Sequence, residues 1–288
     1  MDGNPLAFRS TDGLTLAARD FPGPPGAGVV LCLHGLTRNS RDFTGLAAAL
    51  QAEHRVIAPD QRGRGASAYD PQPLNYNPLV QAGDVWTLLD QQRVERCVVV
   101  GTSMGALMAI LMANARPDRI AGLVLNDAGP EVDPRGLARI AGYVGKGAPV
   151  ASWAEAAAAL QAAQGGSYPT YGPADWMRMA QATYVETPEG RLRPDYDPAL
   201  AQAFATDTGV APDMWPAFEV LRTIPALIVR GALSDILAAD TASEVARRFP
   251  TAEVVTIPDR GHAPDLMEPA ATAAIRAFLR RGDMLARW

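Results

Sequence analysis

The feature that most limits the fold of this chain is the alternation of short apolar runs with stretches of helical spacing. Val29-Val30-Leu31-Cys32-Leu33 ends at His34-Gly35, and Cys97-Val98-Val99-Val100 enters Gly101. Runs of this length, without polar alternation, are typical of strands buried on both faces of a sheet. Strands that alternate with helices predict a mainly parallel sheet that is covered by helices on both sides.

The same pattern recurs along most of the chain. The segment from Gly13 to Ala18 suits one strand of an opening antiparallel hairpin. Further strands are predicted at 55–58, 122–126, 226–230 and 253–257. Helices are predicted at 43–50, 84–90, 104–113, 239–249 and 269–281. The fold class is therefore α/β.

The pattern changes between Pro130 and about Trp215. Strand signals vanish there, and Ala-rich helical stretches appear at 152–163 and 174–184 between Pro and Gly breaks. A chain of 288 residues can form one large α/β unit with an insertion. We expect a core formed by residues 1–129 and 216–288, and a helical insertion at 130–215.

Composition excludes several classes of partner. The net charge of −5 and the lack of any Lys/Arg run argue against a nucleic acid or an anionic membrane. The longest apolar stretch, Met104 to Ala113, is well short of the ~20 residues needed to cross a bilayer. The first residues, Met1 to Pro5, lack the basic and apolar regions of a signal peptide, so a cytoplasmic location is expected.

One five-residue motif carries a specific chemistry. Gly101-Thr102-Ser103-Met104-Gly105 fits G-x-S-x-G and stands between a Val-rich strand and an apolar helix. The turn from strand to helix is sharp, so its neighbours must be small, and it presents the serine hydroxyl at the carboxyl end of the strand. Ser103 is therefore the candidate nucleophile. The alternative is an ordinary Gly-rich turn with a helix-capping serine.

A serine nucleophile needs a base, and the chain has only three histidines. His54 precedes a strand and is expected at the surface, far from the carboxyl ends of the strands. His34 follows a strand but precedes Gly35, which suits a role in shaping a loop. His262 lies in the loop after the last strand, so it is the candidate base.

The base in turn needs a carboxylate that orients it. Asp235 follows the strand at 226–230 and gives the chain order Ser, Asp, His that a G-x-S-x-G serine predicts. Asp127, directly after the strand at 122–126, is the alternative acid. We favour Asp235 on strand order.

Two backbone N–H groups should stabilise the oxyanion that forms during attack. Met104 follows the nucleophile at a helix N-terminus, and Leu36 follows His34-Gly35 at the end of a neighbouring strand. No cofactor or metal is expected. The segment 63–68 formally fits G-x-G-x-x-A, but Pro71 and Pro73 follow it, so no helix can begin there to receive a pyrophosphate. Cys32 and Cys97 cannot supply a four-thiolate metal site.

Taken together, these residues resemble the α/β-hydrolase superfamily, and within it bacterial serine esterase-like hydrolases with a helical cap. The resemblance rests on six segments in order along the chain: HGLTRNSRDF (34–43), APDQRGRGAS (58–67), VVVGTSMGA (98–106), LVLNDAGPEV (123–132), IVRGALSDIL (228–237) and DRGHAPDLMEP (259–269). It implies an eight-stranded sheet, a triad of Ser103, Asp235 and His262, and a cap at about 130–215 over the site. Related dehalogenases and epoxide hydrolases use an aspartate where this chain has Ser103, so their chemistries are disfavoured.

The leading functional hypothesis is a carboxylesterase that cleaves small to medium esters through an acyl-enzyme. A lactonase, or a hydrolase of C–C bonds in ring-cleavage products, would use the same triad. A non-catalytic binding protein on this scaffold is a third hypothesis. The expected partner is a small ester or lactone; monomer and homodimer are both left open. Trp153, Tyr168 and Trp215 are candidate pocket residues from the insertion and its end.

Overall fold

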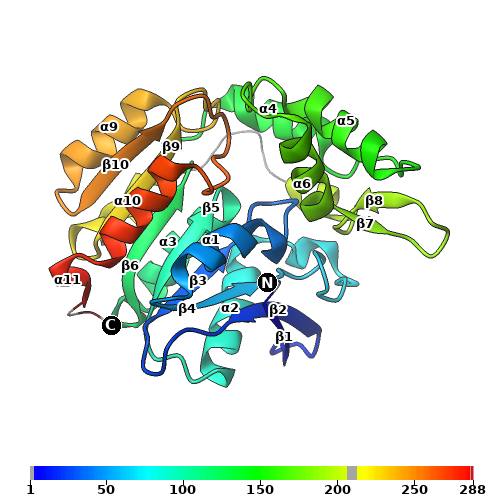
Figure 1. The fold of residues 1–288 in the computed structure, drawn as a ribbon. Coiled ribbons are helices and arrows are strands. Elements are labelled where there is room, and N and C mark those ends of the chain that lie inside the picture. Colours follow the sequence, from blue (N-terminus) through cyan, green and yellow to red (C-terminus); the bar gives the residue numbers. More distant parts are fainter. Residues whose placement is uncertain (1–2, 206–212, 286, 288) are drawn as a thin grey trace.

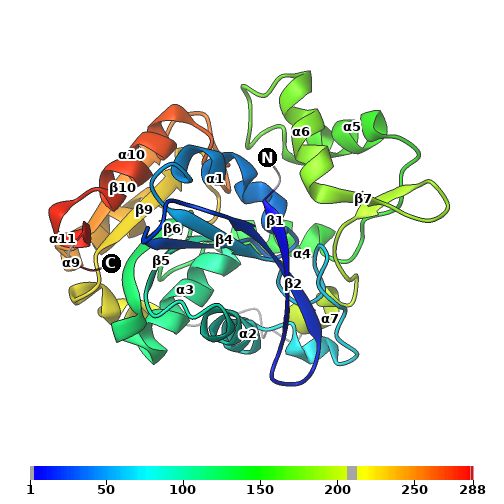
Figure 2. The same cartoon turned by 60° about the horizontal axis from the view of Figure 1, so that its bottom comes forward.

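A computed structural model describes residues 3–205, 213–285 and 287. An eight-stranded sheet in the order β1-β2-β4-β3-β5-β6-β9-β10 runs through its centre (Figures 1 and 2). The strands are β1 (Asn4–Arg9), β2 (Thr15–Phe21), β3 (Val29–Leu33), β4 (Arg55–Pro59), β5 (Cys97–Thr102), β6 (Ile120–Asn126), β9 (Ala226–Gly231) and β10 (Ala252–Ile257). Only the β1–β2 and β2–β4 pairs of this sheet are antiparallel. The predicted opening hairpin and mainly parallel sheet are confirmed.

Helices cover both faces of the sheet because its central strands are apolar on both sides. One face packs against α2 (Pro78–Gln91), α3 (Met104–Ala115), α8 (Trp215–Phe218) and α9 (Ala239–Arg248). The other packs against α1 (Thr44–Leu50), α10 (Pro269–Leu279) and α11 (Gly282–Leu285). These two apolar layers form the core of the α/β fold that the sequence predicts.

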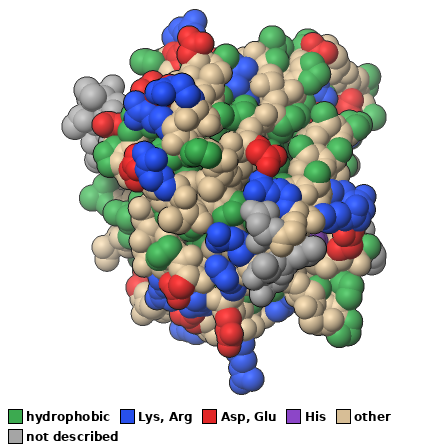
Figure 3. Space-filling view, turned by 90° about the vertical axis from the view of Figure 1, so that its left-hand side faces the viewer, with side chains coloured by type: hydrophobic (Ala, Val, Ile, Leu, Met, Phe, Trp, Pro, Cys, Tyr) green, Lys and Arg blue, Asp and Glu red, His purple; other side chains and the backbone are tan. Residues whose placement is uncertain are grey.

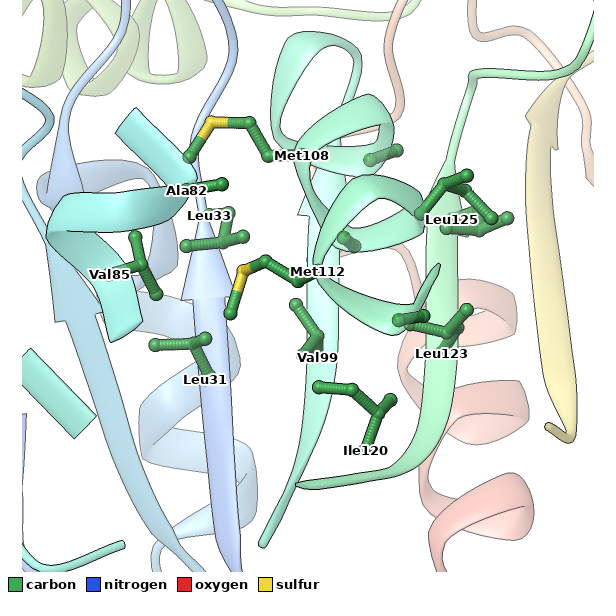
Figure 4. Packing of buried hydrophobic residues seen from close by; sticks show 14 of the residues in the cluster. Leu31, Leu33, Ala82, Val85, Val99, Met108, Met112, Ile120, Leu123 and Leu125 are labelled. Carbon is green, nitrogen blue, oxygen red and sulfur yellow. The ribbon is translucent and has the colours of Figure 1, made fainter. Parts of the chain in front are cut away.

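Helix α3 anchors the first layer. Figure 4 shows Met108 and Met112 on this helix, above Leu31 of β3 and Val99 of β5, and all four side chains are fully buried. Truncation of such a side chain to alanine typically costs about 2–5 kcal/mol of stability. The packing therefore holds the N-terminus of α3 firmly at the end of β5, where the G-x-S-x-G turn lies.

The chain between β6 and β9 contains a segment that we call the inserted segment, from α4 to α7 (134–205). Its helices are α4 (Pro134–Tyr143), α5 (Trp153–Gln164), α6 (Pro173–Thr183) and α7 (Leu200–Ala205). The expected Ala-rich helices are thus α5 and α6. The expectation that this region lacks strands is wrong, because β7 (Tyr184–Glu186) pairs with β8 (Leu192–Pro194). Strands of three residues are too short to show a period in sequence. In Figure 1, α5, α6 and this hairpin project to one side of the sheet.

The surface on the side of α9 to α11 carries mixed charge. Figure 3 shows basic and acidic side chains interspersed there. The contacts on these helices include ion pairs of Arg247 and Arg248 with Glu244, and of Arg276 with Glu53. Each exposed pair of this kind contributes little to stability, so the main effect of these pairs is to balance the charge on this surface. Among the described residues, no helix is long and apolar enough to cross a membrane.

Candidate active site

The G-x-S-x-G segment forms the sharp turn between β5 and α3 that the sequence predicts. Ser103 has φ 54° and ψ −117°, a backbone conformation that non-glycine residues rarely adopt. A Cβ on Gly101 would lie 2.3 Å from the carbonyl oxygen of Gly105, and a Cβ on Gly105 would lie 2.1 Å from that of Leu33. Both glycines are therefore required by the close approach of the helix to strands β5 and β3.

The hydroxyl of Ser103 faces His262 rather than the end of helix α3. Ser103 makes no side-chain capping bond, which removes the alternative of a plain capping serine. Its Oγ lies 2.9 Å from Nε2 of His262, in the loop after β10. This pairing joins the candidate nucleophile and the candidate base across 159 residues of chain.

Asp127 is the carboxylate that completes this chain of hydrogen bonds. Its Oδ2 lies 2.7 Å from Nδ1 of His262 and accepts from the Ser234 hydroxyl at 2.5 Å, while Oδ1 accepts from the Gly231 N–H at 2.9 Å. The Asp127 side chain is fully buried. Three donors therefore hold the carboxylate in one orientation, which is how a buried anion is best satisfied.

The choice of Asp235 as the acid is wrong in this structure. Asp235 pairs instead with Arg139 of α4, through Nε to Oδ2 at 2.6 Å and Nη2 to Oδ1 at 2.7 Å. Hydrogen bonds from Arg139 lower the pKa of Asp235 below its ordinary value. The difference arises because Asp127 directly follows β6, next to β5 in the sheet, whereas three further residues separate Asp235 from the end of β9. Adjacency to the nucleophile strand is the signal that could have favoured Asp127.

The two predicted oxyanion donors lie at the carboxyl ends of β3 and β5. Leu36 and Ser103 both line the cavity described below, and Met104 begins helix α3. Within the described residues, no hydrogen bond is formed by the backbone N–H of Leu36 or of Met104. Both groups are thus free to donate to a ligand.

His34 supports the Leu36 turn. It is fully buried, and burial with the nearby charge of Arg64 lowers its pKa to about 4, so the ring is neutral at pH 7. Nε2 accepts from the Gln61 N–H at 3.0 Å, and Nδ1 therefore carries the proton that it donates to the Gly35 carbonyl at 2.8 Å. The loop-shaping role expected for His34 agrees with this geometry. His54 is buried, 7% exposed, and not at the surface as expected.

A cavity of about 840 Å³ opens in front of Ser103. Tyr168, from the inserted segment, lines it and donates to the Ala263 carbonyl at 2.7 Å, beside His262. Neither Trp153 nor Trp215 is among the described residues that line the cavity. Trp153 packs in the apolar cluster of α5 and α6, and Trp215 donates to Glu131 and stacks on Arg248. Of the three predicted pocket aromatics, the cavity thus contains only Tyr168.

The cavity wall is rich in cations. The basic residues of its described lining are Arg19, Arg38, Arg41, Arg139, Lys146 and Arg178, and the acidic ones are Asp42 and Asp265. Arg38 pairs with Asp42, and Arg139 with Asp235, which leaves these arginines neutralised. Lys146 has no carboxylate within the 4.0 Å ion-pair limit in the described part of the chain; its Nζ donates to the Ala141 carbonyl at 3.1 Å. Lys146, whose side chain is exposed, is thus one cation of the lining with capacity for an anionic ligand.

The fold agrees with the comparison to known proteins. Residues 30–275 match the alpha/beta hydrolase family, so the chain belongs to this family of hydrolases.

Among its relatives, a 3-hydroxybutyrate-oligomer hydrolase of Cupriavidus necator is 34% identical over 271 residues, 91% of this chain and 92% of the relative. A 2-(acetamidomethylene)succinate hydrolase of Mesorhizobium japonicum is 31% identical over 268 residues, 92% of each chain. The crystal structure of an alpha/beta hydrolase from Novosphingobium aromaticivorans is 46% identical, with a TM-score of 0.92, and the match covers 96% of this chain and 98% of that one.

Proposed function

We propose that this protein is a serine carboxylesterase that cleaves small esters through an acyl-enzyme. The observation that carries the proposal is the continuous path from Ser103 through His262 to the buried carboxylate of Asp127. Ser103 Oγ attacks the ester carbonyl, His262 Nε2 takes its proton, and the N–H groups of Leu36 and Met104 donate to the oxyanion. His262 then protonates the leaving alcohol, and water hydrolyses the acyl-enzyme by the same steps.

The substrate that the cavity favours carries a free carboxylate. Lys146 supplies a cation without a carboxylate partner at the cavity wall, and a relative acts on 3-hydroxybutyrate oligomers, which are oligoesters with a carboxylate at one end. We propose that the inserted segment serves as a cap, since α4 and the loop after it bring Arg139 and Lys146 to the cavity above Ser103. A lactonase or C–C hydrolase would use the same triad, so the substrate panel must include these bonds.

The chemistry is tested with p-nitrophenyl butyrate and a fluorophosphonate probe. Ser103→Ala should lose both turnover and labelling, with a fall in kcat of about 10⁵-fold or more. Ser243→Ala, which removes an exposed serine on α9, is the control and should behave as wild type. Undiminished turnover in Ser103→Ala would refute the proposal.

Specificity is tested with a 3-hydroxybutyrate trimer, its methyl ester, a lactone, a dienoate and 2-(acetamidomethylene)succinate. The trimer should have a kcat/KM about 10-fold above that of its methyl ester, since a hydrogen bond to a charged group contributes about 1.5–3 kcal/mol. Lys146→Met should abolish this preference, and Arg135→Met, which changes an exposed arginine of α4 outside the cavity lining, should preserve it. Preferential cleavage of the dienoate or the lactone would favour those activities instead.

A further inference from the structure

One buried arginine of the core has no ion-pair partner among the described residues and contacts both residues whose N–H groups are the predicted oxyanion donors. Arg64 is fully buried, in the loop after β4. Its Nε donates to the Leu36 carbonyl at 2.9 Å, its Nη1 donates to the Arg62 carbonyl at 2.7 Å, and its Nη2 lies 3.9 Å from Met104 Sδ. All three partners are neutral groups.

Arg62, two residues earlier in the same loop, is a buried arginine whose charge is balanced by carboxylates. It is equally buried, yet it forms ion pairs with Asp12, Asp70 and Asp84. No carboxylate in the described residues lies within 4.0 Å of Arg64. The Tyr76 ring is near its guanidinium, and the Tyr76 hydroxyl donates to Asp197 at 2.5 Å, so that acid is already engaged.

Isolated burial of a cation is costly, so an arginine without a counterion needs a reason. Burial lowers the pKa of Arg64 to about 9, which still leaves it charged at neutral pH. An apolar residue would fill the same space without this cost. Two carbonyl acceptors and the nearby Tyr76 ring offset part of this cost, and a negative charge that develops nearby offsets more.

We propose that Arg64 is a positioning residue that orients the Leu36 turn of the oxyanion hole and stabilises the oxyanion by its charge. The two carbonyls that flank the Leu36 amide are both held: Gly35 by the His34 ring and the Arg38 N–H, and Leu36 by Arg64. These bonds fix the direction of the Leu36 N–H, and acceptance at the Gly35 carbonyl makes the N–H of that peptide unit a stronger donor. The charge of Arg64, next to the Leu36 carbonyl and the Met104 side chain, stabilises the oxyanion as it forms.

This inference rests on the proposed function, because it needs Ser103 as a nucleophile. The test therefore uses a ligand that reports on the oxyanion directly. When Ser103 Oγ bonds to the carbonyl carbon of an alkyl trifluoromethyl ketone, the carbonyl electron pair moves to oxygen and the serine proton moves to His262. The resulting hemiketal oxyanion is detected by ¹⁹F NMR. The matching methyl ketone binds the same cavity without a stable adduct.

In Arg64→Met, kcat for p-nitrophenyl butyrate should fall about 10- to 100-fold with KM within about 2-fold, less than the loss of a direct oxyanion donor. Affinity for the trifluoromethyl ketone should fall in the same proportion, and affinity for the methyl ketone should not change. Arg64→Lys keeps the charge but not the forked geometry, so it should show a smaller loss of both quantities. Arg62→Lys is the matched control and should leave the ratio of the two ketone affinities at the wild-type value.

An equal loss of affinity for both ketones in Arg64→Met, or an undiminished kcat of this variant, would overturn the inference. If Arg64→Met does not fold, Arg64→Lys decides alone: wild-type values of kcat and of the ketone ratio would overturn it. The proposed function fails separately, by the absence of a hemiketal signal in the wild-type enzyme. A hemiketal that forms equally well in wild type and Arg64 variants contradicts only the role of Arg64.

Discussion

The loops after β6 and β9 both present an aspartate at the same edge of the sheet, and the two aspartates have opposite surroundings. Asp127 is fully buried, and three donors of the core hold its carboxylate. Asp235 is one-third exposed and is held by Arg139 of the inserted segment. The comparison teaches that carboxylates at equivalent strand ends can serve different parts of the molecule. Asp127 belongs to the α/β core that holds Ser103 and His262, and Asp235 links α4 of the inserted segment to that core.

The largest effect should follow from removing the carboxylate that orients His262. Asp127→Asn should lower kcat by about 10³- to 10⁴-fold, because an amide holds the His262 ring in the wrong tautomer for accepting the Ser103 proton. Asp235→Asn should keep kcat within about 5-fold. Steady-state kinetics on both variants checks this, with circular dichroism to verify folding. A larger loss of kcat in Asp235→Asn than in Asp127→Asn would show that Asp235 is the acid of the triad.

A smaller effect should follow from weakening the support of Asp127. Ser234→Ala removes the hydroxyl that donates to Asp127 and that accepts from the N–H groups of Ile236 and Leu237. We expect kcat to fall about 10-fold, the scale of about 1.4 kcal/mol for one hydrogen bond. Ser243→Ala again serves as the control. A change in KM alone would mean that Ser234 shapes the cavity rather than the carboxylate.

The ion pair between Asp235 and Arg139 of the inserted segment should affect substrate binding more than the chemical step. Arg139→Met should raise KM about 2- to 5-fold with little change in kcat, because α4 loses its bidentate contact to the loop after β9. Its cost in unfolding free energy should be below about 1 kcal/mol, since the pair is one-third exposed and screened. Arg135→Met removes an exposed pair with Asp133, the residue that precedes α4, and should leave KM unchanged. A large loss of kcat would mean that α4 positions the triad.

The smallest effect is the pH dependence of the stability that the Arg139–Asp235 ion pair contributes. Because Arg139 lowers the pKa of Asp235 below 3.8, the ionised pair persists in the folded state at pH values where the unfolded chain begins to take up protons. Its contribution is therefore fully present above about pH 5 and is lost as the pH falls through the lowered pKa. Urea unfolding of wild type and Asp235→Asn should give a constant difference from pH 5 to pH 8. A difference that declines within this range would show that the pair is not the source.

Much of the fold was predictable because strand and helix periods are local. The strand expected at 29–33 coincides with β3, and those expected at 97–100 and 226–230 form β5 and β9 with one or two residues added at the ends. The G-x-S-x-G turn was predictable because its glycines and its serine are neighbours in the chain. The β7–β8 hairpin was not, because its strands are too short and are paired by the tertiary fold.

The sequence by itself determined the mainly parallel sheet, the sharp turn at Ser103, and His262 as its partner among three histidines. It left the carboxylate open between Asp127 and Asp235, since both follow strands. Tertiary structure decided between them, because the path of each loop sets which carboxylate lies 2.7 Å from the imidazole. Only the three-dimensional structure, moreover, distinguishes Arg62 from Arg64. The two are nearly adjacent in sequence, but their charges differ in effect because carboxylates distant in the chain surround one of them and not the other.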